Sequence, residues 1–303
     1  MSALDIFFQQ LINGLVKGSL YAMIALGYTM VYGILGIINF SHGEVFMIGA
    51  MVAMSAATSL LAMGVSPILA LLGAGLVAIM VCIIVSFMIE RWAYRPLRHA
   101  PKLAPLITAL GVSFILQAVA SIIWGLSPRP FPELFPSDYI HLFSNVGTTM
   151  REIIIISVSL VMMGALFLLV NYTQLGRAMR ATSENVHVTA LMGVNPNRVI
   201  SATFMIGAAF AAVAGILYAA NSGKAHFFMG FTPGMKAFIA AVLGGIGNIP
   251  GALVGGLVLG LVESFGAGYI SSEYEDVFSF IVLVLVLILR PSGLLGQRVA
   301  DRS

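Results

Sequence analysis

Four polar side chains stand together between two uncharged stretches of the sequence: Asn39, Ser41, His42 and Glu44. Polar and charged groups at membrane depth are costly, and they usually face a cavity or a partner. These residues are therefore candidates for the lining of a translocation path. A structural interpretation is equally open, because Ser41 and Glu44 have the spacing of a capping box that would close a turn at the membrane edge. His42 and Glu44 have no third ligand nearby, so we predict no metal site.

A second polar group interrupts the uncharged stretch 237–262. A spanning helix needs about 20 apolar residues, so this stretch is long enough to cross a bilayer. Its middle, however, contains Gly244, Gly245, Gly247 and Asn248, followed by a proline. Interrupted apolar segments are good sequence pointers to a transport path. We therefore predict a helix break at these four residues, beside the path, and leave open whether Asn248 lines the path or only caps the turn.

The polar segment 171–198 has a different pattern. Ser183 is placed to cap a short helix over residues 184–192, which Gly193 would end. Apolar side chains, Leu191 among them, would share one side of that helix, and polar ones the other. Such a helix either lies on lipid headgroups or docks against a cytoplasmic partner, and the pattern leaves both readings open.

The composition sets the class of protein that carries these groups. The 303 residues are 59% hydrophobic and only 9% charged, whereas a soluble domain is about 25% charged. The chain is therefore predicted to be an integral membrane protein. We expect Lys17 and Lys236 to reach the membrane interface and Glu263 to be solvated. Residues 1–10 lack the features of a signal peptide, so we expect them to be retained.

The charges also predict a topology. The regions 90–102, 171–198 and 290–302 are rich in Lys and Arg, which favours the cytoplasm. The loops 127–152 and 263–276 are acidic and are placed outside. The C-terminus is then cytoplasmic, and counting backwards puts the N-terminus outside. The residues before and after the stretch 237–262 fall on the same side, so this stretch must enter and return, as a hairpin or a re-entrant loop.

The predicted fold is an all-α polytopic membrane protein with eight or nine crossings, including the broken pair near 237–262. Residues 1–303 would form one transmembrane domain, with 127–152 as its periplasmic loop and 171–198 at the cytoplasmic face. Glycines at spacing four, as at Gly14 and Gly18 or at Gly256 and Gly260, predict close helix packing in lipid. No P-loop, HExxH or nucleophile-elbow motif occurs, and nothing argues for an enzyme or for nucleic-acid binding.

Several segments resemble one family. The sequences GILGIINFSHGE (33–44), LGRAMRA (175–181), the stretch 240–256 and PSGLLG (291–296) are similar to the LivH-type permeases of branched-chain amino-acid ABC importers. The resemblance covers nearly the whole chain, and the motifs are specific when taken together. It implies a type II importer-like permease in the bacterial inner membrane, which carries leucine, isoleucine and valine.

The resemblance also implies partners. They are a homologous second permease, two cytoplasmic ATPases that hydrolyse the ATP, and a periplasmic amino-acid-binding protein; the chain itself would bind no cofactor. The coupling segment against an ATPase would include Arg177, Arg180, Glu184, Leu191 and Gly193. Permeases for urea, amides and other amino acids belong to the same broader family, so the substrate has alternatives. An ion-coupled secondary transporter and a passive channel are the competing functions.

Overall fold

The computed structural model describes residues 3–98, 100–101, 103–136, 138–143, 146–290 and 292–296. Lys102, Pro291, Arg298 and Arg302, which belong to the basic regions and the C-terminal motif discussed above, lie outside the described residues. The described helices are α1 (Ala3–Leu35), α2 (His42–Ala62), α3 (Pro67–Met88), η1 (Ile89–Tyr94), η2 (Arg95–Leu97), α4 (Leu103–Trp124), α5 (Met150–Tyr172), α6 (Gln174–Glu184), α7 (Val186–Leu191), α8 (Pro196–Ser222), α9 (Phe231–Gly244), α10 (Ile249–Tyr269), η3 (Ser272–Tyr274) and α11 (Glu275–Leu289).

Within the described residues, seven helices are long and apolar enough to cross a membrane, namely α1, α2, α3 with η1 and η2, α4, α5, α8 and α10. The short apolar helix α9 has 14 residues and α11 has 15. This confirms the predicted polytopic all-α membrane fold. The turn sequence at residues 64–67 and the pair Asn195–Pro196 each predict the start of a helix, and α3 and α8 do begin at Pro67 and Pro196.

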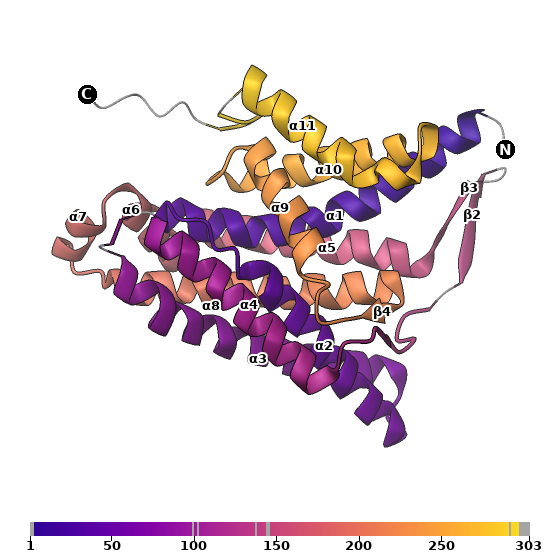
Figure 1. Ribbon diagram of the computed structural model, residues 1–303, viewed down its shortest axis with the longest axis horizontal. Coiled ribbons are helices and arrows are strands. Elements are labelled where there is room, and N and C mark those ends of the chain that lie inside the picture. The colour runs from indigo at the N-terminus through magenta and orange to yellow at the C-terminus, as the bar shows by residue number, and fades with distance from the viewer. Residues whose placement is uncertain are drawn as a thin grey trace.

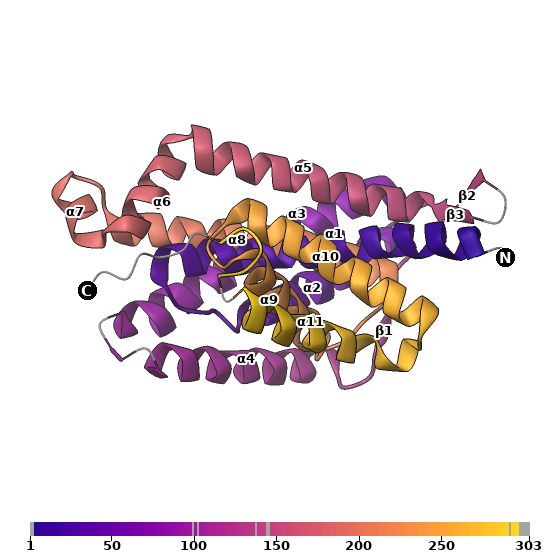
Figure 2. The same cartoon turned by 90° about the horizontal axis from the view of Figure 1, so that it is seen from above.

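The helices differ in how deeply they lie in the bundle. The central helices α1 and α8 are mostly buried, whereas α4 and α5 are mostly exposed. Figure 2 shows α4 and α5 on opposite sides of the bundle, with α1, α8 and α10 between them. The exposed surfaces of α3, α4, α5 and α11 carry large apolar side chains such as Leu72, Phe114, Leu168 and Ile288, as lipid-facing helices do.

The most extensive helix contact is between α1 and α10, and glycines allow it. A Cβ atom on Gly18 would lie 2.8 Å from Cα of Leu257, and one on Gly256 would lie 2.6 Å from Cα of Ala22. Gly14 and Gly260 meet the opposite backbone in the same way. The glycines at spacing four therefore serve backbone-to-backbone packing, as the sequence predicts.

The bundle has two distinct ends. The hairpin end carries the start of α1 and the antiparallel strands β2 (Tyr139–Phe143) and β3 (Val146–Thr149). Strand β3 begins beside Gln9 of α1. The short strands β1 (Arg129–Pro130) and β4 (Lys224–Ala225) also pair. The α7 end is the opposite end, where α6 and α7 project from the bundle (Figure 1).

The interrupted segment forms an antiparallel pair of helices. Figure 1 shows that α9 starts inside the bundle and runs to the α7 end, and that α10 returns to the hairpin end. The turn between them contains Gly245 (φ +102°) and Gly247 (φ +93°). Positive φ angles of this size favour glycine. The predicted helix break is confirmed, because α9 ends at Gly244 and α10 begins at Ile249. The turn lies at the α7 end, where Leu294 and Leu295 donate backbone hydrogen bonds to carbonyls of Leu243 and Gly244 at the end of α9 (2.8 and 3.0 Å).

Candidate functional site

The polar segment 39–44 runs back into the centre of the bundle. After α1 ends at Leu35, Gly36 takes a positive φ, and α2 then begins beside Gly27 of α1. Asn39, Ser41, His42 and Glu44 are all at most 3% exposed. These side chains therefore lie inside the protein and are shielded from its surroundings.

The predicted capping box is absent. Ser41 precedes α2, but its side chain makes no capping hydrogen bond. Its hydroxyl donates instead to Oδ1 of Asn39 (2.5 Å), which also accepts from the hydroxyl of Tyr94 (2.8 Å). The carboxylate of Glu44 points away from the cap, toward α4. Asn39 and Ser41 are thus fixed by one another and by η1, in a structural role.

His42, at the start of α2, lies between α1 and α8. A Cβ atom on Gly27 would overlap with the imidazole ring, and one on Gly207 would lie 3.7 Å from Cε1 of His42. The ring also packs edge-on against Tyr28, with centroids 5.0 Å apart. Nε2 of His42 is buried without a hydrogen-bond partner in the part of the chain described. The residue fills the crossing of three helices.

Glu44 has partners that the sequence analysis missed. Its Oε1 accepts hydrogen bonds from Nε2 of Gln117 (2.7 Å) and from the hydroxyl of Ser113 (3.1 Å), both on α4. Its Oε2 is buried with no partner among the described residues. Ser113 and Gln117 are four residues apart in a largely apolar helix. That spacing places both side chains on one face of the helix. It was the signal in the sequence from which a contact with a buried polar partner was predictable.

The start of α9 meets the start of α2 beside Glu44. A Cβ atom on Gly43 would lie 2.7 Å from the carbonyl oxygen of Gly230, and one on Gly234 would lie 3.1 Å from Cα of Gly43. A groove of about 390 Å³ opens next to this contact, between α2, α4 and α9. Besides Glu44 and the glycines, it is lined by Tyr28, Phe40, Leu106, Leu110, Ser113, Phe231 and Met235.

The four residues of the predicted break lie elsewhere. Gly244 packs against the backbone of Gly251, and Gly245 against the backbone of Gly296. Asn248 caps α10 by accepting from the backbone N–H of Gly251 (3.1 Å), and its Nδ2 donates to the carbonyl of Leu295 (2.6 Å). The helix α9 separates this turn from Glu44 by about 20 Å, at 1.5 Å per residue. The structure thus does not bring the two predicted groups together.

A buried charge cluster joins α9, α10 and α11. Nζ of Lys236 lies 3.1 Å from Oε1 of Glu263 and 2.7 Å from Oδ1 of Asp276. Glu263 is fully buried and accepts hydrogen bonds from the hydroxyls of Tyr21 (2.8 Å) and Ser279. The predictions that Lys236 reaches the interface and that Glu263 is solvated are therefore wrong. Lys17 pairs with Glu275 (2.7 Å) at the edge of the same cluster.

The predicted helix over residues 184–192 begins two residues later than expected, as α7. Ser183 lies inside α6, and Asn185 caps α7 by accepting from the N–H groups of His187 and Val188 (both 3.0 Å). The prediction that Ser183 caps this helix is wrong, because Asn185 is the cap within the same stretch. The predicted end of the helix is correct: α7 closes at Leu191, and Gly193 follows with φ +83°.

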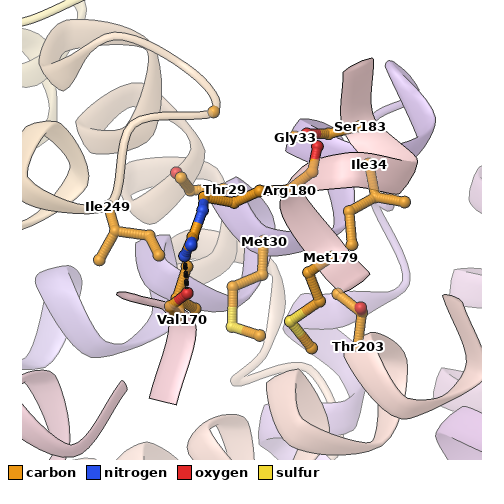
Figure 3. Close-up of a pocket in the computed structure, with 11 residues that line it drawn as sticks. Thr29, Met30, Gly33, Ile34, Val170, Met179, Arg180, Ser183, Thr203 and Ile249 are labelled. Carbon is orange, nitrogen blue, oxygen red and sulfur yellow. Dashed lines mark hydrogen bonds between the residues drawn. The ribbon is translucent and has the colours of Figure 1, made fainter. Parts of the chain in front are cut away.

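Arg180 faces its own chain. Figure 3 shows its side chain reaching toward Val170, and a guanidinium nitrogen donates to the backbone carbonyl of that residue at the end of α5. Arg180 and Met179 from α6, Thr29 from α1 and Thr203 from α8 line a small cavity of about 90 Å³. Arg180 thereby holds α6 against the end of α5. Arg177 and Glu184 are exposed.

A second groove, of about 720 Å³, lies beside α7. It is lined by residues from the end of α1, from η2, and from the start of α7 and α8, including Ile34, Arg95, Arg98, His187 and Asn197. Arg98 pairs with the buried Glu90 and donates to Oδ1 of Asn197 (2.5 Å). Burial lowers the pKa of the Arg98 guanidinium, while Glu90 raises it. On α7 and directly after it, Leu191 is 86% and Met192 80% exposed.

Comparison with known proteins gives matches along most of the chain. A family model described as branched-chain amino acid transport system / permease component matches residues 10–287. The high-affinity branched-chain amino acid transport system permease protein LivH of Salmonella typhimurium is 47% identical over 96% of both chains. The corresponding protein BraD of Pseudomonas aeruginosa is 46% identical over 96% of both. A solved structure, PsaBC from Streptococcus pneumoniae in complex with Fab, aligns with a TM-score of 0.47 at 12% identity over 92% and 91% of the two chains.

Proposed function

The chain belongs to the family of branched-chain amino acid transport system permease components, and from that premise we propose that it is the membrane-spanning subunit of an ATP-driven importer for leucine, isoleucine and valine. The observation that carries the proposal is the 47% identity to LivH over 96% of both chains. Similarity of this extent favours the same substrate class over urea, amides or other amino acids.

The proposed setting is the bacterial inner membrane, with the α7 end in the cytoplasm. The basic residues Arg95, Arg98, Arg177 and Arg180 lie at the α7 end, and the positive-inside bias supports this orientation. The acidic residues Glu152, Glu275 and Asp276 lie toward the hairpin end. The chain would form one transmembrane domain, with residues 127–152 in the periplasm and residues 171–198 as its cytoplasmic coupling segment.

The importer would need other subunits. A homologous second permease, two ATPases and a periplasmic amino-acid-binding protein complete the proposed assembly, and the ATPases hydrolyse the ATP. The exposed Leu191 and Met192, beside the groove lined by Arg95 and Arg98, support an ATPase contact at α7. Arg180 contributes to this contact by holding α6 in place, whereas Arg177 and Glu184 are exposed to the partner itself.

The substrate path would pass the groove at Glu44. Of the residues predicted from the sequence, Glu44 lines a groove between helices, while Asn39, Ser41 and His42 support the backbone that carries it. Gly244, Gly245, Gly247 and Asn248 act as the turn between α9 and α10, at the proposed cytoplasmic end of the path.

Reconstitution tests the proposed function. The chain is placed in vesicles alone, and then with the second permease, the ATPases and the binding protein, and leucine uptake is measured with and without ATP. We expect uptake only from the complete assembly with ATP. Uptake by the chain alone under a proton or sodium gradient would identify an ion-coupled transporter instead, and downhill flux without nucleotide would identify a channel.

A further inference from the structure

Two helices begin in the interior of the protein and face each other. The starts of α2 and α9 touch at Gly43 and Gly230, where a Cβ atom on Gly43 would lie 2.7 Å from the carbonyl oxygen of Gly230. The N-terminus of a helix carries about half a positive charge. This contact therefore places a positive pole inside the bundle, next to the groove between α2, α4 and α9.

The negative pole is the carboxylate of Glu44, which is 1% exposed. Its Oε1 is occupied by Ser113 and Gln117, but its Oε2 is buried with no partner among the described residues. Oε2 faces the start of α9, 2.8 Å from the place of a Cβ on Gly230. A buried carboxylate oxygen without a donor is costly, so this oxygen is available to a ligand that brings a hydrogen-bond donor.

The groove beside these poles suits an apolar side chain. Its volume of about 390 Å³ falls in the range of roughly 300–1,000 Å³ that small-molecule sites occupy. Most of the side chains that line it are apolar, among them Leu106, Leu110 and Met235. The site therefore combines one free carboxylate oxygen, one positive pole and an apolar wall.

We propose that this groove holds the zwitterion of a branched-chain amino acid in transit, with its ammonium against Oε2 of Glu44. The carboxylate of the ligand lies toward the first turn of α9, and its aliphatic side chain against Leu106, Leu110 and Met235. This inference rests on the proposed function and names the site at which that function recognises its substrate.

Simpler ligands fit the groove less well. A metal ion would find a single carboxylate, because the described residues contain no group of three His, Cys, Asp or Glu side chains that could hold one. A small anion would bring no hydrogen-bond donor for Oε2 of Glu44. A zwitterion has no net charge, and its two separated charges match the two poles.

Cysteine labelling tests the site directly in the assembled transporter. Leu110 is 39% exposed, whereas the native Cys82 is fully buried, so a Leu110→Cys variant offers one accessible thiol. The reagent is a small methanethiosulfonate, and the added ligands are leucine, 4-methylpentanoate, which lacks the amino group, and 3-methylbutylamine, which lacks the carboxylate. We expect saturating leucine to slow labelling about tenfold, the ratio that corresponds to 1.4 kcal/mol, and the two analogues to have little effect. Equal protection by all three, or none by leucine, would overturn the proposal.

Substitution of Glu44 provides the second measurement. We expect Glu44→Gln to abolish protection by leucine and to lower ATP-driven leucine uptake about tenfold or more, because a hydrogen bond to a charged group is lost. ATP hydrolysis stimulated by the binding protein should persist. The control is Glu133→Gln, which removes an exposed carboxylate and should leave uptake unchanged.

The two proposals fail in different ways. If the unaltered assembly takes up no leucine with ATP, the proposed function is wrong. If it does, while Glu44→Gln transports at the unaltered rate, only the site is wrong. If Glu44→Gln does not assemble, the ligand series on Leu110→Cys alone decides.

Discussion

The ammonium of Lys236 on α9 lies 3.1 Å from Oε1 of Glu263 on α10, and the two side chains are 8% and 0% exposed. Asp276 at the start of α11 approaches the same ammonium to 2.7 Å. One lysine therefore connects three consecutive helices in the C-terminal third of the chain. Because both Lys236 and Glu263 are buried, each depends on the other for compensation of its charge.

Removal of this lysine should destabilise the protein strongly. Lys236→Met leaves Glu263 buried beside Asp276 without its cation, and breaking a buried pair in this way costs about 3–5 kcal/mol. The double variant with Glu263→Gln should recover much of the loss. Thermal unfolding in detergent measures both. The matched control is Lys17→Met, whose side chain is 32% exposed and whose loss should cost at most about 1 kcal/mol. Equal losses for the two lysines would contradict this account.

A methyl group at Gly255 should separate α9 from α10. A Cβ atom there would overlap with the carbonyl oxygen of Ala240 and lie 2.7 Å from the backbone nitrogen of Gly244. We expect Gly255→Ala to cost about 1–3 kcal/mol, as overpacking does. In α5, nothing lies within 4 Å of a Cβ at Gly164, so Gly164→Ala should be neutral or stabilising by up to about 1 kcal/mol. The same unfolding measurement compares them, and a stable Gly255→Ala would show that the helices are free to move apart.

Asn248 should stabilise two segments at once. Asn248→Ala removes the cap of α10 and the hydrogen bond to the carbonyl of Leu295, and loss of a cap alone costs about 0.5–2 kcal/mol. We expect faster hydrogen exchange at the amides of Leu294 and Leu295, which bond to the end of α9. The control is Asn171→Ala, because that exposed side chain bonds only locally to Phe167. Unchanged exchange would mean that residues 292–296 are held without Asn248.

The contact with the ATPase should depend on the apolar surface of α7. Leu191→Ser removes an 86% exposed side chain, so the fold should be unaffected. If Leu191 is an interface hot spot, the loss of about 1–2 kcal/mol weakens the association roughly 5–30-fold. Co-purification of the ATPase with the membrane-inserted chain measures this. The control is Leu126→Ser, which changes a 72% exposed side chain just after the C-terminal end of α4 and should have no effect on the association. Equal loss of the ATPase from both variants would contradict a specific contact at Leu191.

Arg180 and Glu184 should affect the same association by different routes. Arg180→Ala frees α6 from the carbonyl of Val170, so it should weaken association by letting α6 move. Glu184→Ala changes only an exposed side chain. Both variants should insert into the membrane normally. Unchanged co-purification and transport for both would remove Arg180 and Glu184 from the coupling role.

Local signals in the sequence predicted much of the fold. The proline at position 67 and the pair Asn195–Pro196 marked helix starts that the structure confirms, because capping and proline geometry act over a few residues. Counting crossings from the loop charges correctly required the stretch 237–262 to turn back. The sequence did not show where along the bundle the turn lies, because the partners of Gly244 and Gly245 are residues 251 and 296.

The candidate site was only partly predictable. Glu44 stood out as an acid between apolar stretches, but its burial depends on Ser113, Gln117 and Gly230, which are distant in sequence. Lys236 and Glu263 were misjudged for the same reason. A charged residue near the end of an apolar segment is normally solvated, and only the fold reveals that another charge compensates it.

The contact of α1 with α10 has a consequence for motion. Where Gly18 meets Leu257 and Gly256 meets Ala22, backbone touches backbone, so no side-chain rotation is available to let one helix slide along the other. These two helices must move as a single rigid body. The helix α4 stands at the side of the bundle (Figure 2) and hydrogen-bonds to Glu44 through Ser113 and Gln117. A transport cycle that widens the groove at Glu44 by moving α4 outward would break these two hydrogen bonds and the one from Nε1 of Trp124 to the hydroxyl of Ser55 on α2.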